Sequence, residues 1–387
     1  MTAYSPGGTS LYPDSAYMSA DYSNAVIIES GISKFDKLTL QKLLTGKTAG
    51  VYPYVAELNE GFNGSSNQKD LETMLQLTYL YFTQPRKSVD DFKTFMSKEK
   101  SQNEHLLDNP GAYFAHKFQQ IIFNKNIRRG LTTIDKLNMV NFEDAFKIYQ
   151  ERFKDASDFT FIFVGNFEVD KIKPLLETYL GGLPSNGQKE SWKDPAIEKR
   201  EGLVVSRIQM GKTQKDLVGI HFHGQTNWTE EENYTFNSMI KILNIQLREA
   251  LREDKGGAYG VGVNGGFSQR PKNAYGINIQ FNTEPKRVDE LIKTVYENID
   301  SLKNNLVSEE KIIKVQETQR REREMDLKEN DFWLNVLQYY DEYGKDIQLL
   351  FDYDKQIDGL TAQKIKDAFK KYFDISNHVE VVLEPEK

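Results

Sequence analysis

The hydrophobic pattern around residues 240–263 predicts a helix that ends where a strand begins. Apolar residues recur there at helical spacing, at Ile240, Leu243, Leu247 and Leu251. Gly256 and Gly257 form a helix stop signal, and residues 258–263 alternate small and apolar side chains as a strand does. Arg252 and Tyr259 flank this stop, seven positions apart (259 − 252). A fold-back would bring a guanidinium and a phenol to one surface, where they could grip a peptide carbonyl.

An internal repeat organises the rest of the chain. Residues 137–164 and 357–384, at an offset of 220 (357 − 137), each predict an N-capped amphipathic helix that leads into a strand. A second match pairs residues 40–52 with residues 247–259 at an offset of 207 (247 − 40), and it places Thr45 at the position of Arg252. The two offsets differ by 13 residues (220 − 207), which indicates one duplicated unit with insertions rather than a short solenoid period.

The repeat predicts an α+β fold made of two tandem homologous units. Residues 1–190 form the first unit and residues 191–387 the second, with the join in the loop-rich stretch that begins at residues 181–187. We expect each unit to be an antiparallel-rich sheet with helices packed on one face. Within the first unit, the polar stretch at residues 57–66 is predicted to be a turn or loop because it is rich in Gly, Asn and Ser.

The beginning of the first unit is shorter than its repeat predicts. The second unit begins with two predicted strands, at residues 203–209 and 217–223, whereas residues 3–8 match only the end of the second strand. Counterparts of residues 202–220 are missing. We therefore expect an N-terminally truncated first unit in a fragment of a longer chain, with an unpaired sheet edge as the physical cost.

Composition narrows the class of protein. The chain has 387 residues, enough for two or three domains, and 39% of them are hydrophobic, as in folded proteins. A net charge of −7 and a sequence pI near 5.5 give no sign of a nucleic-acid partner. No apolar run reaches the roughly 18 residues of a membrane helix, so no membrane insertion is expected, and the first residues do not form a signal peptide. The absence of cysteine excludes disulfides and thiolate chemistry.

Two motifs resemble those of a known family. Leu251-Arg252, a short polar loop and then Gly257-Ala-Tyr-Gly-Val261 are similar to the signature of the C-terminal, non-zinc-binding half of the pitrilysin/insulysin zinc metallopeptidases, the inverzincins. Val164-Gly165-Asn166, followed by Tyr179-Leu-Gly-Gly-Leu-Pro184, resembles the motif that ends a domain in that family. With the repeat, the resemblance extends over nearly the whole chain.

This resemblance implies a function for the chain. In the family, an Arg and a Tyr at this spacing contact the substrate backbone in a closed chamber, so Arg252 and Tyr259 are implied to be substrate-binding residues. The chain would be the non-catalytic, substrate-clamping half of a clamshell-shaped zinc metalloendopeptidase. Its partners would be a peptide substrate and a zinc-binding N-terminal half, either fused or a separate chain. The chain alone is predicted to be inactive. The sequence contains no recognisable targeting signal, and the resemblance to the family alone suggests a location in the periplasm or cell envelope.

The chain is predicted to hold no catalytic residue and no metal ligand, because the family's zinc motif is missing. That motif, His-x-x-Glu-His, supplies two ligands and the base that activates water. None of the five histidines lies in such a pattern, and the helix expected at residues 20–29 has no histidine; the five are His105, His116, His221, His223 and His378.

Three alternatives to a substrate-clamping role remain open. The first is a non-catalytic structural or peptide-binding subunit of a peptidase-like heterodimer. In the second, His221 and His223 project from one face of a strand and hold a metal in an unrelated enzyme, although no third ligand follows at a recognisable spacing. In the third, Arg252 only complements a helix dipole and Tyr259 is an ordinary strand residue.

Overall fold

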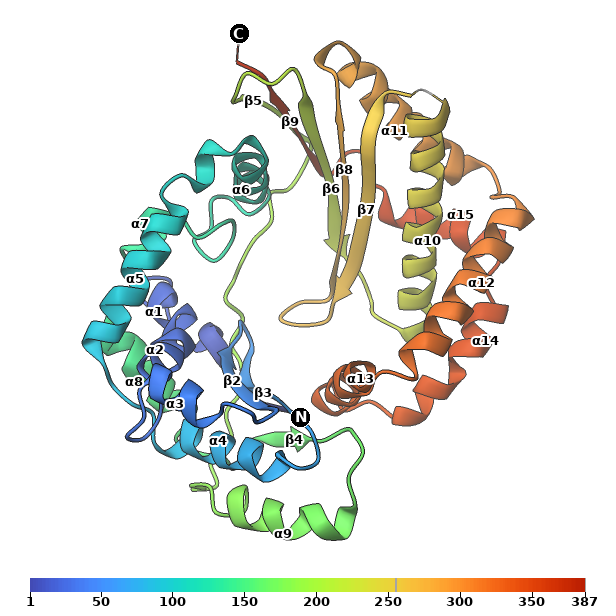
Figure 1. Cartoon of the computed structure of the whole chain (residues 1–387). Helices are drawn as coiled ribbons and strands as arrows, with labels where there is room; N and C mark the ends of the chain where they lie inside the picture. The colour runs from blue at the N-terminus through green and yellow to red at the C-terminus, as the bar shows by residue number, and fades with distance from the viewer. Residues whose placement is uncertain (255, 387) are drawn as a thin grey trace. The chain divides into compact units, whose positions relative to one another are not determined.

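The computed structural model describes residues 1–254 and 256–386 and divides into two compact units (Figure 1). Unit 1 comprises Met1–His105, Thr132–Pro195 and Leu327–Lys345, and unit 2 comprises Leu106–Leu131, Ala196–Asp326 and Asp346–Lys387. Each half of the sequence therefore lends one segment to the other unit. The predicted division near residue 190 follows the sequence repeat. In the structure, Leu106–Leu131 pack with unit 2 and Leu327–Lys345 pack with unit 1.

Each unit contains one sheet, and the two sheets share a strand order. Unit 1 has the order β2-β3-β1-β4 and unit 2 has the order β5-β9-β6-β8-β7. In unit 1 the strands are β1 (Thr2–Pro6), β2 (Ala49–Val55), β3 (Asn59–Ser66) and β4 (Thr160–Ile162). In unit 2 they are β5 (Val204–Gln209), β6 (Asp216–Gln225), β7 (Ala258–Ser268), β8 (Ala274–Thr283) and β9 (His378–Glu384). The order β7-β8-β6-β9 repeats β2-β3-β1-β4, so the duplication predicted from the sequence is present in the topology.

The two sheets differ at one edge. Strand β5 pairs in parallel with β9, and every other strand pair is antiparallel. Within the described part of the chain, unit 1 has no strand equivalent to β5, so β4 ends its sheet. The position of β4 at the end of the sheet agrees with the repeat, and the truncation of the first unit stays a prediction.

Helices cover both sheets, and several begin as the sequence predicts. In α8 (Phe142–Arg152) the Asn141 side chain accepts from Asp144 N at 3.1 Å, and in α15 (Ala362–Tyr372) the Thr361 hydroxyl accepts from Lys364 N at 3.2 Å. The other helices of unit 1 are α1 (Tyr17–Asp21), α2 (Ser23–Ser30), α3 (Lys37–Leu43), α4 (Leu71–Thr83), α5 (Val89–Asn103), α7 (Ile134–Leu137), α9 (Val169–Tyr179) and α13 (Asn330–Glu342). Those of unit 2 are α6 (Pro110–Ile122), α10 (Glu230–Arg248), α11 (Val288–Asn304), α12 (Glu309–Asp326) and α14 (Tyr353–Asp358). Among the described residues, no helix combines the length and apolar character needed to cross a bilayer.

The sheet of unit 2 is buried on both faces. Val382 of β9 packs in the core that contains α10, α11 and α15, while its neighbours Val381 and Leu383 pack against Phe114 and Phe118 of α6. Because successive strand residues point to opposite faces, α6 lies on the other side of the sheet from α10 (Figure 1). The predicted α+β class with helices on a sheet face is confirmed, and the structure adds a second helical layer.

The sheet of unit 1 also receives a helix from the other half of the sequence. Ala3 of β1 belongs to the main core, which includes residues of α2, α4 and α8. The neighbouring residues Thr2 and Tyr4 point to the opposite face. There the Thr2 hydroxyl donates to Gln338 Oε1 at 2.9 Å, and the Tyr4 hydroxyl donates to Asp341 Oδ2 at 2.6 Å. Helix α13 thus plays for unit 1 the part that α6 plays for unit 2.

The prediction of a turn or loop at residues 57–66 is wrong, because residues 59–66 form strand β3. This strand lies between β1 and β2, and a Cβ atom on Gly61 would lie 1.8 Å from the Ala3 carbonyl oxygen. Glycine is therefore required by the close approach of two backbones in a sheet interior, not by a turn.

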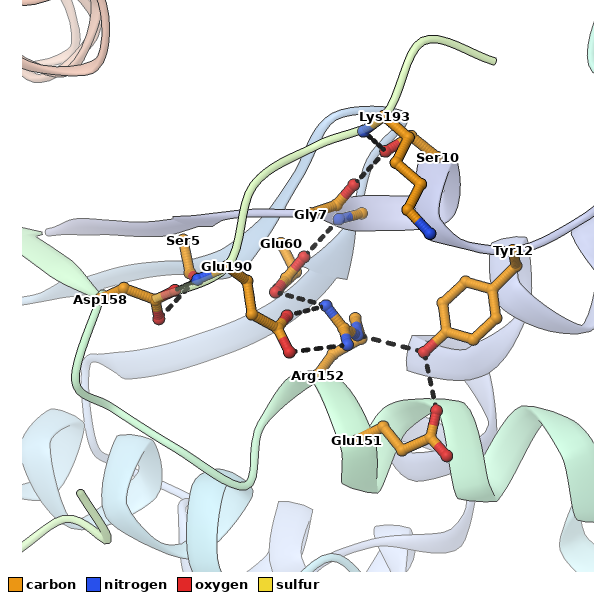
Figure 2. Close-up of polar contacts among 11 residues, drawn as sticks. Ser5, Gly7, Ser10, Tyr12, Glu60, Glu151, Arg152, Asp158, Glu190 and Lys193 are labelled. Atoms are coloured by element: carbon orange, nitrogen blue, oxygen red, sulfur yellow. Dashed lines mark hydrogen bonds and ion pairs between the residues drawn. The ribbon is translucent and has the colours of Figure 1, made fainter. Parts of the chain in front are cut away.

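A buried ionic network fastens the segment after α9 to the sheet of unit 1 (Figure 2). Glu60 is 1% exposed, accepts from Gly8 N at 2.5 Å and lies 3.5 Å from Arg152 Nη1. Arg152 also pairs with Glu190 and donates from Nε to the Tyr12 hydroxyl at 3.1 Å. A buried arginine with two carboxylates and a phenol is well satisfied, so residues near Glu190 are held in place.

Burial raises the pKa of Glu60 to about 8, although Arg152 and the Gly8 N–H both favour the charged form. The folded chain therefore binds this proton at pH values where the unfolded chain, with an ordinary glutamate pKa, has released it. Stability from this group is present at acidic pH and decreases as pH rises towards 8.

We expect Glu60→Gln to flatten the dependence of stability on pH. The amide keeps an acceptor for Gly8 N–H but cannot ionise. Between about pH 5 and pH 8 the free energy of unfolding of the wild-type chain should fall by on the order of a few kcal/mol more than that of the variant. Chemical denaturation across this range measures both, with Glu177→Gln at an exposed position of unit 1 as control. Parallel curves for wild type and E60Q would show that Glu60 has no such pKa shift.

A second prediction concerns the contact between α6 and its sheet. A Cβ atom on Gly219 would lie 3.0 Å from the rings of Phe114 and Phe118, so Gly219→Ala should destabilise unit 2 by about 1–3 kcal/mol. Gly262 lies in β7 of the same sheet with nothing within 4 Å of the corresponding point, so Gly262→Ala should be neutral or slightly stabilising. Equal denaturation midpoints for the two variants would contradict this account.

Candidate functional site

The helix that carries Arg252 ends as predicted. Helix α10 continues into a π-helical segment, η3 (Glu249–Asp254), on which Arg252 is exposed. Gly256 has φ +58°, a left-handed conformation that favours glycine, and Gly257 N donates to Leu251 O at 3.1 Å. The glycine pair thus turns the chain out of the helix and directly into β7.

Tyr259 lies at an irregularity at the start of β7. The pairing with β8 runs from Ala258 opposite Thr283 to Gly260 opposite Asn282, so Tyr259 is the extra residue of a β-bulge. Its side chain is 63% exposed. The segment η3 contacts β7, so Arg252 and Tyr259 are both exposed on adjoining elements at one end of the sheet. The substrate-binding role of the pair stays a prediction.

A third side chain, which sequence reasoning missed, lies beside Tyr259. Lys215 Nζ is 4.8 Å from the centroid of the Tyr259 ring, within range for a cation–π contact. Lys215 directly precedes β6. Asp216 of β6 pairs with Thr283 of β8, which pairs with Ala258 of β7, so the residues next to Asp216 and Ala258 lie at the same end of the sheet. No local motif signals this contact, because it depends on two strand registers.

Asp216 follows Lys215 and is buried at the same end of the sheet. It is 1% exposed, and its Oδ1 atom has no hydrogen-bond partner within the described residues. Burial raises the pKa of Asp216 to about 6, and Glu384 adds to the shift. Asp216 lies in the same strand row as Ala258, next to Tyr259, and loses its negative charge only as pH falls below about 6.

His221 and His223 project from one face of β6, as their alternate spacing predicts, with ring centroids 5.4 Å apart. Each ring already has a partner: His221 Nδ1 lies 2.8 Å from Asn278 Oδ1, and His223 Nε2 donates to the Arg200 carbonyl oxygen at 3.0 Å. In the described part of the chain, no three His, Cys, Asp or Glu side chains gather closely enough to hold a metal ion. The resemblance places the zinc in the partner half, and the described residues of this chain bring no set of three such ligands together.

The first unit has no histidine where the zinc motif would lie. Helix α2 (Ser23–Ser30) reads Ser-Asn-Ala-Val-Ile-Ile-Glu-Ser, with Val26 and Ile27 fully buried in the core. Side chains that pack a core replace the imidazoles required for a zinc site.

Comparisons with known proteins show which proteins this chain resembles. A profile described as Peptidase M16 inactive domain matches residues 140–319. A Haemophilus influenzae protein described as probable zinc protease PqqL is 26% identical over 327 residues, which are 79% of this chain and 33% of that protein. The chain spans between 33% and 38% of the length of the curated relatives it matches.

Solved structures share the fold over the whole chain. The periplasmic protease PqqL from Escherichia coli has a TM-score of 0.84 and 18% identity, covering 100% of this chain and 42% of that one. A protease from Helicobacter pylori has a TM-score of 0.80 and 13% identity, covering 99% of this chain and 94% of that one. The profile, the relatives and the fold agree with the resemblance found in the motifs. Residues 140–319 thus match the Peptidase M16 inactive domain, the sequence relatives are PqqL-like zinc proteases, and the chain has the fold of M16 protease halves.

Proposed function

We propose that this chain is the substrate-clamping, non-catalytic half of an M16 zinc endopeptidase, in which Arg252 and Tyr259 bind the peptide backbone. The observation that carries the proposal is the exposure of both side chains on adjoining elements at one end of the sheet of unit 2. Tyr259 is 63% exposed, and Arg252 is exposed as well. Both groups are thus available to an external ligand.

The chemistry of the pair suits a peptide carbonyl. A guanidinium presents several N–H donors in a fixed plane, and a phenol adds one O–H donor. Lys215 lies over the Tyr259 ring and so limits the positions the ring can take. Donors held in place stabilise an oxygen that gains negative charge during peptide cleavage more than the neutral carbonyl of the substrate, which lowers the barrier.

The metal and the general base belong, in this proposal, to a partner half. Zinc bound there would polarise the scissile carbonyl and supply activated water. The partner is a zinc-binding half, fused or separate, and the short coverage of the relatives supports its existence. The structurally similar protease PqqL from E. coli is periplasmic, which supports a location of this chain in the periplasm or cell envelope.

A second candidate function is a purely structural or peptide-binding subunit of a peptidase-like heterodimer. The apolar residues of α2 at the position of the zinc motif agree with this role as well as with the clamping role, since both place the catalytic metal elsewhere. The exposed Arg252 and Tyr259 favour the clamping role, because a structural subunit has no need of that pair.

We expect Arg252→Ala to lower kcat/KM for an unstructured fluorogenic peptide by about 100-fold in the assembly of this chain with its zinc half, and Tyr259→Phe by about 10- to 100-fold. Two control variants should leave cleavage unchanged. Tyr52→Phe alters the repeat counterpart of Tyr259, which is also 63% exposed, and Arg248→Ala removes an exposed arginine four positions before Arg252. Cleavage at the wild-type rate by the R252A/Y259F double variant would instead support the structural subunit.

The chain by itself should not hydrolyse peptides, because its described residues offer no zinc site. The measurement is cleavage of the same fluorogenic peptide by the purified chain, with and without added zinc. Activity that appears in this preparation and disappears with a chelator would refute the assignment of catalysis to a partner half.

A further inference from the structure

A cation and a buried imidazole meet on the face of the unit 2 sheet that α6 leaves partly open. The cation is Lys199, on the segment that leads into β5. Three hydrogen bonds fix this segment: Arg200 N donates to Ile122 O at 2.7 Å, His223 Nε2 donates to Arg200 O at 3.0 Å, and Gly202 N donates to Asn377 Oδ1 at 2.8 Å. Lys199 is thus positioned by the fold and does not belong to a loose linker.

Lys199 has no carboxylate partner in the described part of the chain. Its side chain is half-buried, and its Nζ lies 5.8 Å from the centroid of the Phe123 ring. Burial, with a contribution from nearby Arg129, lowers the pKa of Lys199 to about 8. An anion bound at Nζ would favour the charged form and offset the cost of burying it.

His221 supplies the second half of the site. The residue is 5% exposed, and its Nε2 atom is buried without a hydrogen-bond partner among the described residues. Both groups approach one point above Gly276: a Cβ atom there would lie 3.3 Å from Lys199 Nζ, 3.2 Å from His221 Cε1 and 3.9 Å from His221 Nε2. Gly276 leaves open the space that any other side chain would fill. Buried polar atoms are nearly always satisfied, so an unsatisfied Nε2 beside an unpaired ammonium indicates a ligand.

The two groups line a surface hollow of about 380 Å³. Its polar lining is Lys199, His221, Asn264, Ser268, Tyr275 and Asn278, and none of the described residues that line it is acidic. Strand β7 lies beside the hollow and ends the sheet, and Gly262 and Gly266 have nothing within 4 Å of the points where side chains would project. An extended peptide has room to lie along this bare strand with one end in the hollow.

We propose that Lys199 and His221 bind a carboxylate of a peptide, most simply its C-terminal carboxylate, while the peptide lies along β7. The Lys199 ammonium donates to one carboxylate oxygen and His221 Nε2–H to the other. This requires the neutral tautomer with its proton on Nε2, so the Asn278 amide turns its NH2 group towards His221 Nδ1, which then accepts. One cation with one neutral imidazole matches a single negative charge, whereas a phosphate dianion calls for more donors. The ligand class rests on the proposed function, since peptides are the substrates of the family.

The test is direct binding to the purified full chain, which needs no cleavage. The probes are an N-acetylated, unstructured decapeptide without Asp or Glu, the same peptide with an amidated C-terminus, and the amidated peptide with one internal Asp. We expect the free acid to bind at least about tenfold more tightly than the amide. If the internal Asp restores binding, a side-chain carboxylate also serves as the ligand.

Variants identify the residues responsible. Lys199→Met keeps the apolar stem and should abolish the preference for the free acid, whereas Lys293→Met, at an exposed ion-paired lysine on α11, should leave the preference intact. Gly276→Val fills the hollow without removing the charge and should abolish the preference as well. Circular dichroism and thermal melting confirm that each variant is folded.

Three results would overturn this proposal. They are equal affinities for acid and amide, no binding of the free acid at about millimolar concentration, and an unchanged preference in folded K199M. Arg252→Ala separates this site from the proposed function. Normal cleavage by assembled R252A, with loss of the acid preference in K199M, would reject the clamping role and keep this site. The opposite pair of results would keep the clamping role alone.

Discussion

The structure depends on sheets that bury both faces. In β9, the odd-numbered residues pack against α6, and Val382 packs in the opposite core. The polar residues His378 and Glu380 on that second face are buried as well, so both faces of the strand are covered. A sheet of this kind needs a helix on each side, and each unit obtains the second helix from the other half of the sequence. The positions of β6, β8 and β7 follow from this two-sided packing, and with them the end of the sheet where Arg252 and Tyr259 lie.

Local patterns predict the elements of this fold well, and they predict the long-range partners poorly. The periodicity at residues 240–251 and the glycine pair correctly indicate a helix that turns into a strand, because both signals come from neighbouring residues. The pattern also shows that Phe114 and Phe118 are apolar at helical spacing, but nothing in it states which sheet they cover. The exchange of α6 and α13 is a property of packing between distant segments. Strand β3 was missed for a different reason, since Gly61 has the composition of a turn and the role of a strand residue in a crowded sheet.

The residues of the candidate site also differ in whether a local pattern or a long-range contact identifies them. Arg252 and Tyr259 could be predicted because one short stretch carries both. Lys215 could not, because its contact with Tyr259 passes through the register of three strands. The sequence also does not predict that Lys199 lies beside His221. Hydrogen bonds to α6, to His223 and to Asn377 place the segment that carries Lys199 against the sheet. The alternate spacing of His221 and His223 correctly predicts that both project from one face of the strand, but it does not predict that Lys199 lies beside His221.

The exchanged helices limit how this chain can be divided. A cut in the loop after residue 181 would separate the two sequence repeats, yet the first fragment would keep α6 without its sheet, and the second would keep α13 without its own. The second fragment would expose the apolar face of β9 that α6 covers, and the first would leave Thr2 and Tyr4 without their partners on α13. Exposed apolar surface of this kind promotes aggregation. The two repeats are therefore one folding module, and any natural or engineered shuffling of this protein must move the pair together.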